Sequence, residues 1–257
     1  MKPSPIVARP RVFFRSPGRA RMRGRGRVRA VRGIFPRSVL ALGGCRSGKT
    51  AWAEAAGLEL ARNMAGGQRP RLIYIATALA GDDPAMQARI ARHQTLRDPA
   101  WQTLEAPFDL PEALAKVMSQ ISDADGGADC GPGPGAGCGA DPGLPHVVLI
   151  DCVTVWLANL MAAGHDDRAI LERAERLAAL LRQPACPVFV ISNETGLGVA
   201  PSTALGNLFR DIAGLVNQTL VKSCDEVYFI VSGLAQKLKS VPEPSARCKF
   251  RPCRGCT

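Results

Sequence analysis

The chain has 257 residues, of which 46% are hydrophobic, and a formal net charge of +11 at pH 7. This length suits one well-buried domain and is too short for two large ones. No apolar run approaches the ~20 residues of a bilayer-spanning helix, so we expect no membrane span. The positive charge is concentrated at one end of the chain, because residues 1–37 hold 12 of the 33 Lys and Arg and no acidic residue. Residues 38–257 are left with 21 basic and 22 acidic residues, so we do not expect nucleic acid as a partner of the folded part.

The Arg-, Pro- and Gly-rich leader at 1–37 has too little apolar content to fold alone and is predicted to be disordered. Three interpretations stay open. It is an extension without function, for example one translated from an upstream start codon, or a basic arm for nucleic acid or anionic surfaces, or an Arg-rich transit peptide.

The first elements after the leader are a strand, a loop and a helix. Ser38–Leu42 is a short apolar stretch, a Gly-rich loop follows, and the segment from Thr50 to about Asn63 is rich in Ala, Leu and Glu. Leu72–Ala76 follows a turn and is predicted to be a second buried strand. A helix is then predicted from an N-cap and proline pair, Asp83-Pro84, to about Arg97.

The second half continues the alternation. Residues 111–121 favour a helix, and Asp123–Pro145 is a Gly-, Pro- and Ala-rich insertion that we expect to be a mobile surface loop. His146–Ile150 is an apolar run typical of a strand buried on both faces. The remaining predicted elements are a helix at Asp166–Arg182, a strand at Pro187–Ser192, a helical face from Leu205 to Leu220, and a last strand at Glu226–Val231.

Strands that alternate with helices predict an α/β fold of the P-loop NTPase (RecA-like) type, with a mostly parallel sheet and helices on both faces. We expect one catalytic domain at 38–239, including the insertion at 123–145, and a disordered tail at 240–257. The nine Cys form no evident disulfide framework, which favours a reducing cytoplasm. In the tail, Cys248, Cys253 and Cys256 have a spacing known from some iron–sulfur proteins, but incidental thiols explain them without a fourth ligand.

The Gly-rich loop has the phosphate-binding pattern G-x-x-x-x-G-K-T between a strand and a helix. Its backbone N–H groups can surround phosphates, the lysine reaches the outer phosphates, and the last hydroxyl can bind Mg²⁺. The loop residues are Gly43, Gly44, Cys45, Arg46, Ser47, Gly48, Lys49 and Thr50. This pattern predicts binding of a nucleoside triphosphate.

Asp151 follows an apolar strand, at the point where such folds place the carboxylate that holds the magnesium shell. An ordinary cap of the next helix is the other interpretation. Thr50 and Asp151 are therefore the candidate metal residues.

Six ordered segments narrow the prediction, and they extend over about Val39 to Lys239. Together they closely resemble the bifunctional adenosylcobinamide kinase / adenosylcobinamide-phosphate guanylyltransferase family. The segments are Gly43–Thr50 (GGCRSGKT), Tyr74–Ala78 (YIATA), Ala88–His93 (ARIARH), Trp101–Glu105 (WQTLE), Leu149–Asn159 (LIDCVTVWLAN) and Ser192–Gln218.

The resemblance implies that His93 attacks the α-phosphate of GTP and becomes a covalent GMP–histidine. On a helix, Arg89, His93 and Arg97 would lie one turn apart on the same face. Neighbouring cations favour the neutral imidazole that attack requires, and they can also hold a triphosphate. Without the resemblance, a solvated histidine on a charged helix face would explain the pattern.

The resemblance also implies a set of guanine-nucleotide contacts. These are Thr77, Ala78, Leu79, Gln94, Thr95, Leu96, Arg97, Glu105 and Asp151. Glu105 could accept from the N1–H and 2-amino edge of guanine. A later family motif matches Asn193, Glu194, Arg210, Asp211, Asn217 and Gln218, with their contacts left open. The chain departs from the family pattern at Cys45, where alanine is usual, and at Asn207, where arginine is usual.

The resemblance implies phosphorylation of adenosylcobinamide with ATP or GTP, assisted by Lys49 and Mg²⁺, and then transfer of GMP from GTP through His93 to adenosylcobinamide phosphate. It further implies a cytoplasmic homotrimer. Two alternatives stay open: a P-loop small-molecule kinase or NTPase without a covalent histidine, and a nucleic-acid-binding ATPase that uses the basic leader.

Overall fold

The computed structural model describes residues 36–65, 70–79, 81, 84–126 and 146–240. Seven strands and six helices lie in this part of the chain. The strands are β1 Ser38–Gly43, β2 Arg71–Ala76, β3 Trp101–Glu105, β4 His146–Asp151, β5 Val188–Asn193, β6 Glu226–Val231 and β7 Leu234–Lys239. The helices are α1 Lys49–Met64, α2 Pro84–Leu96, α3 Leu110–Gly126, α4 Val153–Ala162, α5 Asp167–Arg182 and α6 Ala204–Ser223.

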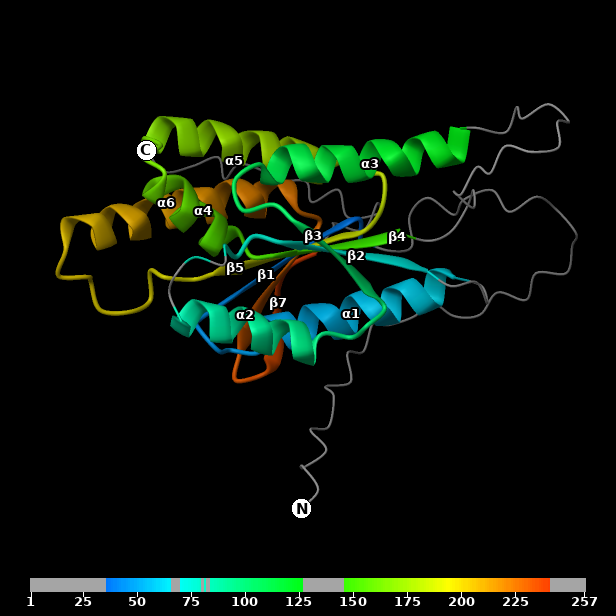
Figure 1. Cartoon of the computed structure of the whole chain (residues 1–257), viewed down its shortest axis with the longest axis horizontal. Helices are drawn as coiled ribbons and strands as arrows, with labels where there is room; N and C mark the ends of the chain where they lie inside the picture. Colours follow the sequence, from blue (N-terminus) through cyan, green and yellow to red (C-terminus); the bar gives the residue numbers. More distant parts are fainter. Residues whose placement is uncertain (1–35, 66–69, 80, 82–83, 127–145, 241–257) are drawn as a thin grey trace, which may run out of the picture.

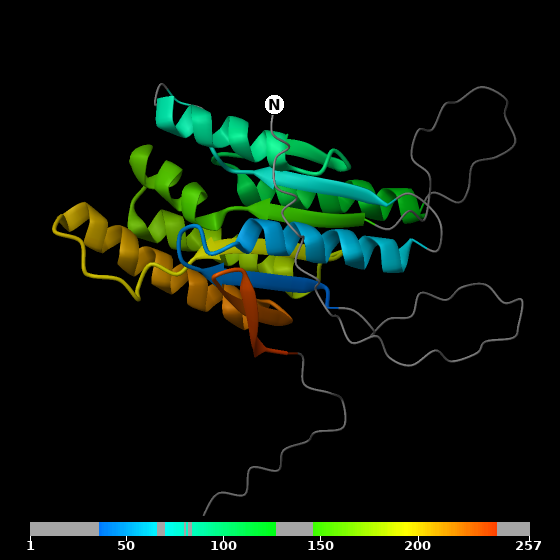
Figure 2. The same ribbon diagram turned by 90° about the horizontal axis from the view of Figure 1, so that it is seen from below.

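The strands form one sheet in the order β3-β2-β4-β5-β1-β6-β7. Strands β1 to β6 are parallel, and β7 pairs antiparallel with β6 at one edge. Helices α1 and α2 cover one face, and α3 to α6 cover the other (Figure 1). Seen from below, α2 lies toward the β3 edge and the β6–β7 hairpin lies at the opposite edge (Figure 2). The α/β fold with a mostly parallel sheet and helices on both faces is confirmed.

The central strands are buried on both faces, which explains their uninterrupted apolar sequences. In β4, Val147 and Leu149 pack on the α1 side, whereas Val148 and Ile150 belong to the larger core beneath α3 to α6. All four side chains have 0% exposure. Successive side chains of a strand point to opposite faces, so one such run supplies both cores.

The long helices show the amphipathic pattern expected from their sequence. In α5 the apolar stripe of Ile170, Ala174, Leu177, Ala178 and Leu181 is buried, and the helix packs mainly on α6 and α3. The helix begins at Asp166, whose carboxylate accepts a hydrogen bond from the Ala169 amide at 2.7 Å. Such an N-cap satisfies one of the amides that lack a partner in the first turn.

Three expectations about elements need correction or remain outside the described residues. Glu226–Val231 is not the last strand, because β7 follows it through a two-residue turn. Ser232 and Gly233 have φ values of 51° and 81°, as tight hairpins require, and the exposed β7 gave no apolar signal. The predicted insertion at 123–145 begins as helix, since α3 continues to Gly126. The leader, the rest of the insertion and the Cys-containing tail lie outside the described residues, apart from the last residues of the leader and Ser240.

Within the described ranges, no helix is both long enough and apolar enough to cross a bilayer.

Candidate active site

The phosphate-binding loop lies between β1 and α1, at the carboxyl edge of the sheet. Gly48 adopts a φ of 94°, which side-chain-bearing residues rarely reach, and it directs the chain into α1. The Lys49 ammonium donates to the carbonyl oxygens of Gly43 at 3.0 Å and Gly44 at 2.6 Å, and lies 3.4 Å from Ser47 Oγ. The lysine is only 7% exposed, so its charge is held at the centre of the loop.

Two neighbouring segments support this loop from outside. The Gly233 amide, in the turn of the β6–β7 hairpin, donates to the Ser47 carbonyl at 2.8 Å. The Glu194 amide, just after β5, donates to the Gly43 carbonyl at 3.0 Å. The hairpin was missed in the sequence, although its Ser-Gly turn is a recognisable hairpin signal.

Asp151, at the end of β4, faces the start of α1. Its Oδ2 atom accepts hydrogen bonds from Thr50 Oγ1 at 3.0 Å and from the Tyr74 hydroxyl at 2.5 Å. Burial, followed by the adjacent Asp151 charge, raises the pKa of Tyr74 far above its ordinary value, so the phenol stays protonated and donates. The N-cap of α4 is Cys152, with no side-chain cap bond. The interpretation of Asp151 as an ordinary helix cap is therefore wrong.

The backbone next to Asp151 is fixed by buried polar side chains. The peptide bond between Asp151 and Cys152 is cis. Thr77 Oγ1 donates to the Cys152 carbonyl and accepts from the Cys152 amide, both at 2.8 Å. Asn159 Nδ2 donates to the Thr77 carbonyl at 2.8 Å. The end of β2 thus holds the turn that presents the carboxylate.

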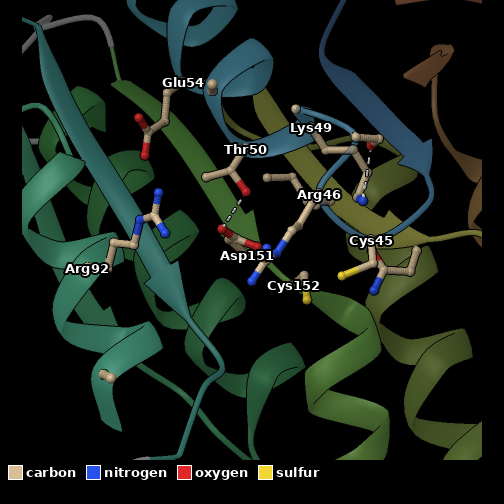
Figure 3. Close-up of a pocket in the computed structure, with 14 residues that line it drawn as sticks. Cys45, Arg46, Lys49, Thr50, Glu54, Arg92, Asp151 and Cys152 are labelled. Atoms are coloured by element: carbon tan, nitrogen blue, oxygen red, sulfur yellow. Dashed lines mark hydrogen bonds between the residues drawn. The ribbon is translucent and has the colours of Figure 1, made fainter. Parts of the chain in front are cut away.

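A cavity of about 800 Å³ opens beside the loop. Figure 3 shows Arg92 of α2 and Arg46 of the loop entering it from different sides, with the hydrogen-bonded Thr50 and Asp151 between them. The lining residues are Cys45, Arg46, Ser47, Gly48, Lys49, Thr50, Ala51, Glu54, Ala88, Arg92, Asp151, Cys152, Ile191 and Asn193. The lining contains three cationic side chains and two carboxylates, together with the oxygen and amide groups of the loop. This composition suits the binding of a polyphosphate.

A second, smaller cavity of about 60 Å³ lies on the other side of Asp151, which lines both. Its lining residues are Tyr74, Ala76, Ala78, Ile90, Gln94, Arg97, Thr103, Glu105, Asp151, Cys152 and Val155. Arg97 is the cationic residue that lines this cavity. Its guanidinium carbon lies 3.3 Å from the centre of the Tyr74 ring, and its Nη1 donates to Thr103 Oγ1 at 2.5 Å.

A buried polar network supports the loop that follows β5. Asn217 of α6 accepts from Ser192 Oγ at 2.7 Å and donates to the Asn193 carbonyl at 3.0 Å. Thr154 Oγ1 accepts from the Asn193 amide at 2.7 Å. Of the later motif, Asn217 and Asn193 therefore act in a network adjoining the large cavity, and Asn193 also lines it.

Comparison with known proteins identifies the family. The model described as "Cobinamide kinase / cobinamide phosphate guanyltransferase" matches residues 39–124 and 140–238. The chain belongs to this family. The unmatched stretch 125–139 lies inside the predicted insertion at 123–145.

Three curated relatives match nearly their whole length. The bifunctional adenosylcobalamin biosynthesis protein CobP of Pseudomonas aeruginosa is 36% identical over 79% of this chain and 98% of its own. The bifunctional adenosylcobalamin biosynthesis proteins CobU of Salmonella typhimurium and Escherichia coli are each 32% identical, over 78% of this chain and 99% of their own. A solved structure from Pyrococcus horikoshii OT3 matches with a TM-score of 0.43 and 9% identity, over 80% of this chain and 87% of its own, which bears on neither function nor site.

Family membership makes α2 the helix of interest, since it carries His93. The backbone of His93 lies in this helix, but its side chain, like those of Arg89 and Leu96, lies outside the described residues. Helix α2 ends at Leu96, so Arg97 follows the helix and turns toward Tyr74. The expected row of Arg89, His93 and Arg97 stays a prediction, and Arg92 is a cation of α2 that lines the large cavity.

The other predicted contacts divide into four groups. Ala78, Gln94, Arg97 and Glu105 meet at the small cavity, and Cys45 to Thr50 meet at the large one. Gly43 and Gly44 act through their carbonyls on Lys49. Thr77 is fully buried, Leu79 is exposed, and exposed Thr95 donates to the Ala91 carbonyl of its own helix at 2.9 Å. Tyr74, Arg92 and Cys152 were not predicted, because their approach depends on the sheet order.

Proposed function

We propose that this chain phosphorylates adenosylcobinamide with ATP or GTP and then transfers GMP from GTP to adenosylcobinamide phosphate, giving adenosylcobinamide-GDP. The observation that carries the proposal is the large cavity, where the phosphate-binding loop, the Asp151 carboxylate and α2 meet. Family membership supplies the reaction pair. One phosphate-binding site beside a helix with a candidate nucleophile fits both a phosphoryl and a nucleotidyl transfer.

In the kinase step the substrate hydroxyl oxygen attacks the γ-phosphorus, and the bond from that phosphorus to the bridging oxygen breaks. ADP or GDP leaves, and the hydroxyl proton is released to water. The loop amides and Lys49 hold the phosphates and stabilise the negative charge that develops on the transferred group. Lys49 is already directed into the loop by carbonyl contacts, which phosphate oxygens can replace.

In the guanylyltransferase step a ring nitrogen of His93 attacks the α-phosphorus of GTP, and pyrophosphate leaves. A phosphate oxygen of adenosylcobinamide phosphate then attacks the same phosphorus, and breaking of the P–N bond restores the imidazole. The guanylyl group is thus transferred in two displacements at the same phosphorus, first to His93 and then to the substrate phosphate.

The place of α2 supports this assignment. Ala88 and Arg92 of this helix line the large cavity, and Ile90 and Gln94 line the small one. The helix that carries position 93 therefore borders both cavities.

Thr50 and Asp151 fit a magnesium ion. Their oxygens lie 3.0 Å apart beside the phosphate-binding loop, and hydroxyl and carboxylate oxygens are the hard ligands that Mg²⁺ prefers. Among the described residues no group of three or more His, Cys, Asp or Glu could form a metal site. A single carboxylate suits an ion that takes its other ligands from phosphates and water. Bound there, Mg²⁺ would neutralise charge on the triphosphate.

Glu105 and the small cavity supply the proposed preference for guanine. The Glu105 carboxylate, at the end of β3, lines this cavity together with Gln94 and Arg97. It can accept hydrogen bonds from the N1–H and 2-amino groups of guanine. Adenine does not present this pair of donors. Replacing Glu105 by Gln, which retains one acceptor oxygen and adds a donor, should narrow the difference in affinity between GTP and ATP.

The decisive test is incubation with GTP labelled at the α-phosphate. The chain should acquire a label that is acid-labile and stable in alkali, and His93→Ala should not be labelled. His165→Ala is the matched control, since His165 lies outside both cavities and its variant should keep the label. Persistence of the label in His93→Ala would exclude this nucleophile, and absence of label in the wild type would favour a plain P-loop kinase or NTPase.

A truncation separates this function from a nucleic-acid-binding ATPase. The Arg37 amide donates to the Asp225 carboxylate at 2.7 Å, and its guanidinium donates to the Pro184 carbonyl, so the deletion should stop at residue 36. Deleting residues 1–36 should leave GTP labelling intact and abolish any nucleic-acid binding. Labelling that depends on the leader would contradict the proposal.

The assembly and location also belong to the proposal. We expect a cytoplasmic homotrimer, with a mass by light scattering of about three times the 27.3 kDa of one chain.

A further inference from the structure

Tyr74 is a buried aromatic residue that the reaction as described above does not use. It lies in β2 with 2% exposure, and its hydroxyl donates to Asp151 Oδ2 at 2.5 Å. Thr50 Oγ1 donates to the same oxygen at 3.0 Å. Two donors on one oxygen restrict rotation of the carboxylate.

The Tyr74 ring is itself held by its neighbours. The Arg97 guanidinium covers one ring face at 3.3 Å, and Trp101 meets the ring edge-on at a centroid distance of 6.3 Å. Arg97 is in turn bonded to Thr103 of β3 at 2.5 Å. A cation over an aromatic face and an edge-to-face ring pair both stabilise a fixed ring orientation. The hydroxyl is therefore aimed at Asp151 by the packing around the ring.

These contacts join the two halves of the site. Arg97 is the first residue after α2, the helix with position 93, and Asp151 lies between the large and the small cavity. The connected contacts run from the end of α2 through the Tyr74 ring to the carboxylate next to the phosphate-binding loop.

Tyr74 differs from Thr50, the other donor to Asp151 Oδ2, in one respect. The Thr50 hydroxyl oxygen is itself a candidate ligand of the metal, whereas the Tyr74 phenol is not among the candidate metal residues. Tyr74 can therefore act on this carboxylate by orienting it alone.

We propose that Tyr74 is a positioning residue, whose hydroxyl holds Asp151 in the orientation that binds the magnesium–nucleotide complex and whose ring joins that carboxylate to the end of α2. This inference rests on the proposed function, because it takes Asp151 as the metal carboxylate. It adds a residue that acts through Asp151 and does not itself touch the phosphates.

The test uses GDP binding to the full-length protein, measured by calorimetry with Mg²⁺ and with a chelator in its place. Tyr74→Phe removes the hydroxyl and keeps the ring under Arg97. A hydrogen bond to a charged group is worth roughly tenfold in affinity or more. We expect the increase in GDP affinity caused by Mg²⁺ to fall about tenfold in Tyr74→Phe, while the affinity without Mg²⁺ changes little.

Tyr228→Phe is the matched control. Tyr228 is the other tyrosine of the chain, its hydroxyl also donates to a carboxylate, that of Glu226 at 2.8 Å, and its ring also packs on an aromatic neighbour, Trp52 at 4.7 Å. It lines neither cavity. Its variant should keep the full effect of Mg²⁺, so a general loss of stability cannot imitate the result.

A second measurement covers the case in which Tyr74→Phe does not fold. Because the chain has two tyrosines, fluorotyrosine incorporated into Tyr228→Phe labels Tyr74 alone. Its ¹⁹F signal should move when Mg²⁺ is added to the GDP complex. A signal that does not respond to Mg²⁺ would overturn the inference.

Other results would also overturn it. One is an unchanged Mg²⁺ effect in Tyr74→Phe, and another is an equal loss of affinity with and without Mg²⁺. In an Asp151→Ala background, Tyr74→Phe should have no further effect on Mg²⁺ dependence, and an additive loss would show that Tyr74 does not act through Asp151. Failure of the proposed function is distinguishable, because the wild type would then show no GDP binding or no GTP-derived label.

Discussion

Replacing Gly43 by alanine would add a methyl group where β1 meets the phosphate-binding loop. The added carbon would overlap the carbonyl oxygen of Ile230 in β6 and lie 3.2 Å from its carbon and 2.9 Å from Ser47 Oγ. Gly44, the next residue, offers the matched control, because a Cβ there meets nothing within 4 Å.

The cost follows from which atoms must move. Ile230 is in the strand next to β1, and the two strands are paired over Val39 to Leu42, so relief of the overlap requires displacement of paired backbone. Overpacking in well-packed regions costs about 1–3 kcal/mol, and a backbone obstacle favours the upper end. We therefore expect Gly43→Ala to lose about 3 kcal/mol of unfolding free energy, or about 6–12 °C in Tm for a domain of this size.

Thermal and urea unfolding of the two variants tests this reasoning. Gly44→Ala should stay within about 0.5 kcal/mol of the wild type, since nothing obstructs its methyl group. Because β1 leads into the loop that holds Lys49, Gly43→Ala should also bind GDP more weakly. If Gly43→Ala is as stable as Gly44→Ala, the close approach of β6 to the loop is wrong.

Three further predictions concern other described residues. Asn217→Ala removes two buried hydrogen bonds and should cost about 2–3 kcal/mol, whereas Gln218→Ala, at an exposed neighbour, should cost less than about 0.5 kcal/mol in the same urea titration. Cys45 is exposed in the loop, so alkylation of its thiol should block GDP binding, and bound GDP should slow the alkylation. The Cys45→Ala variant should bind GDP within about twofold of the wild type and should not lose binding when it is treated with the alkylating reagent. Burial raises the pKa of the Cys186 and Cys224 thiols to about 12, above the value in the unfolded chain. The free energy of unfolding should therefore fall as the pH rises above about 9, by up to about 1.4 kcal/mol per pH unit for each thiol. Urea midpoints that are level from about pH 8 to 10 would contradict this.

Most of the fold could be predicted from local patterns. The apolar runs that became β1, β4 and β5 are uninterrupted because these strands are buried on both faces, and the shorter apolar runs of β2 and β6 were sufficient to predict those strands. By contrast, β7 has almost no buried side chain and is defined by pairing with β6, which a hydrophobic pattern does not report. Its turn nevertheless supports the phosphate-binding loop through Gly233.

The candidate site divides in the same way. The loop at 43–50 could be identified from its sequence because its glycines, lysine and threonine act locally, within one strand-to-helix turn. Asp151 could be proposed from its place after an apolar strand, but its partners could not, since Tyr74 and Thr50 are 77 and 101 residues away along the chain.

The amino-acid sequence by itself determined the phosphate-binding loop, the family, and the alternation of strands and helices, because each is expressed in short stretches of sequence that can be read without knowing how the chain folds. Only the tertiary structure decided that Asp151 lies between two cavities, that Arg92 lines the large cavity while Arg97 turns onto Tyr74, and that a hairpin supports the loop. These contacts arise from the strand order, which brings distant segments to one edge of the sheet.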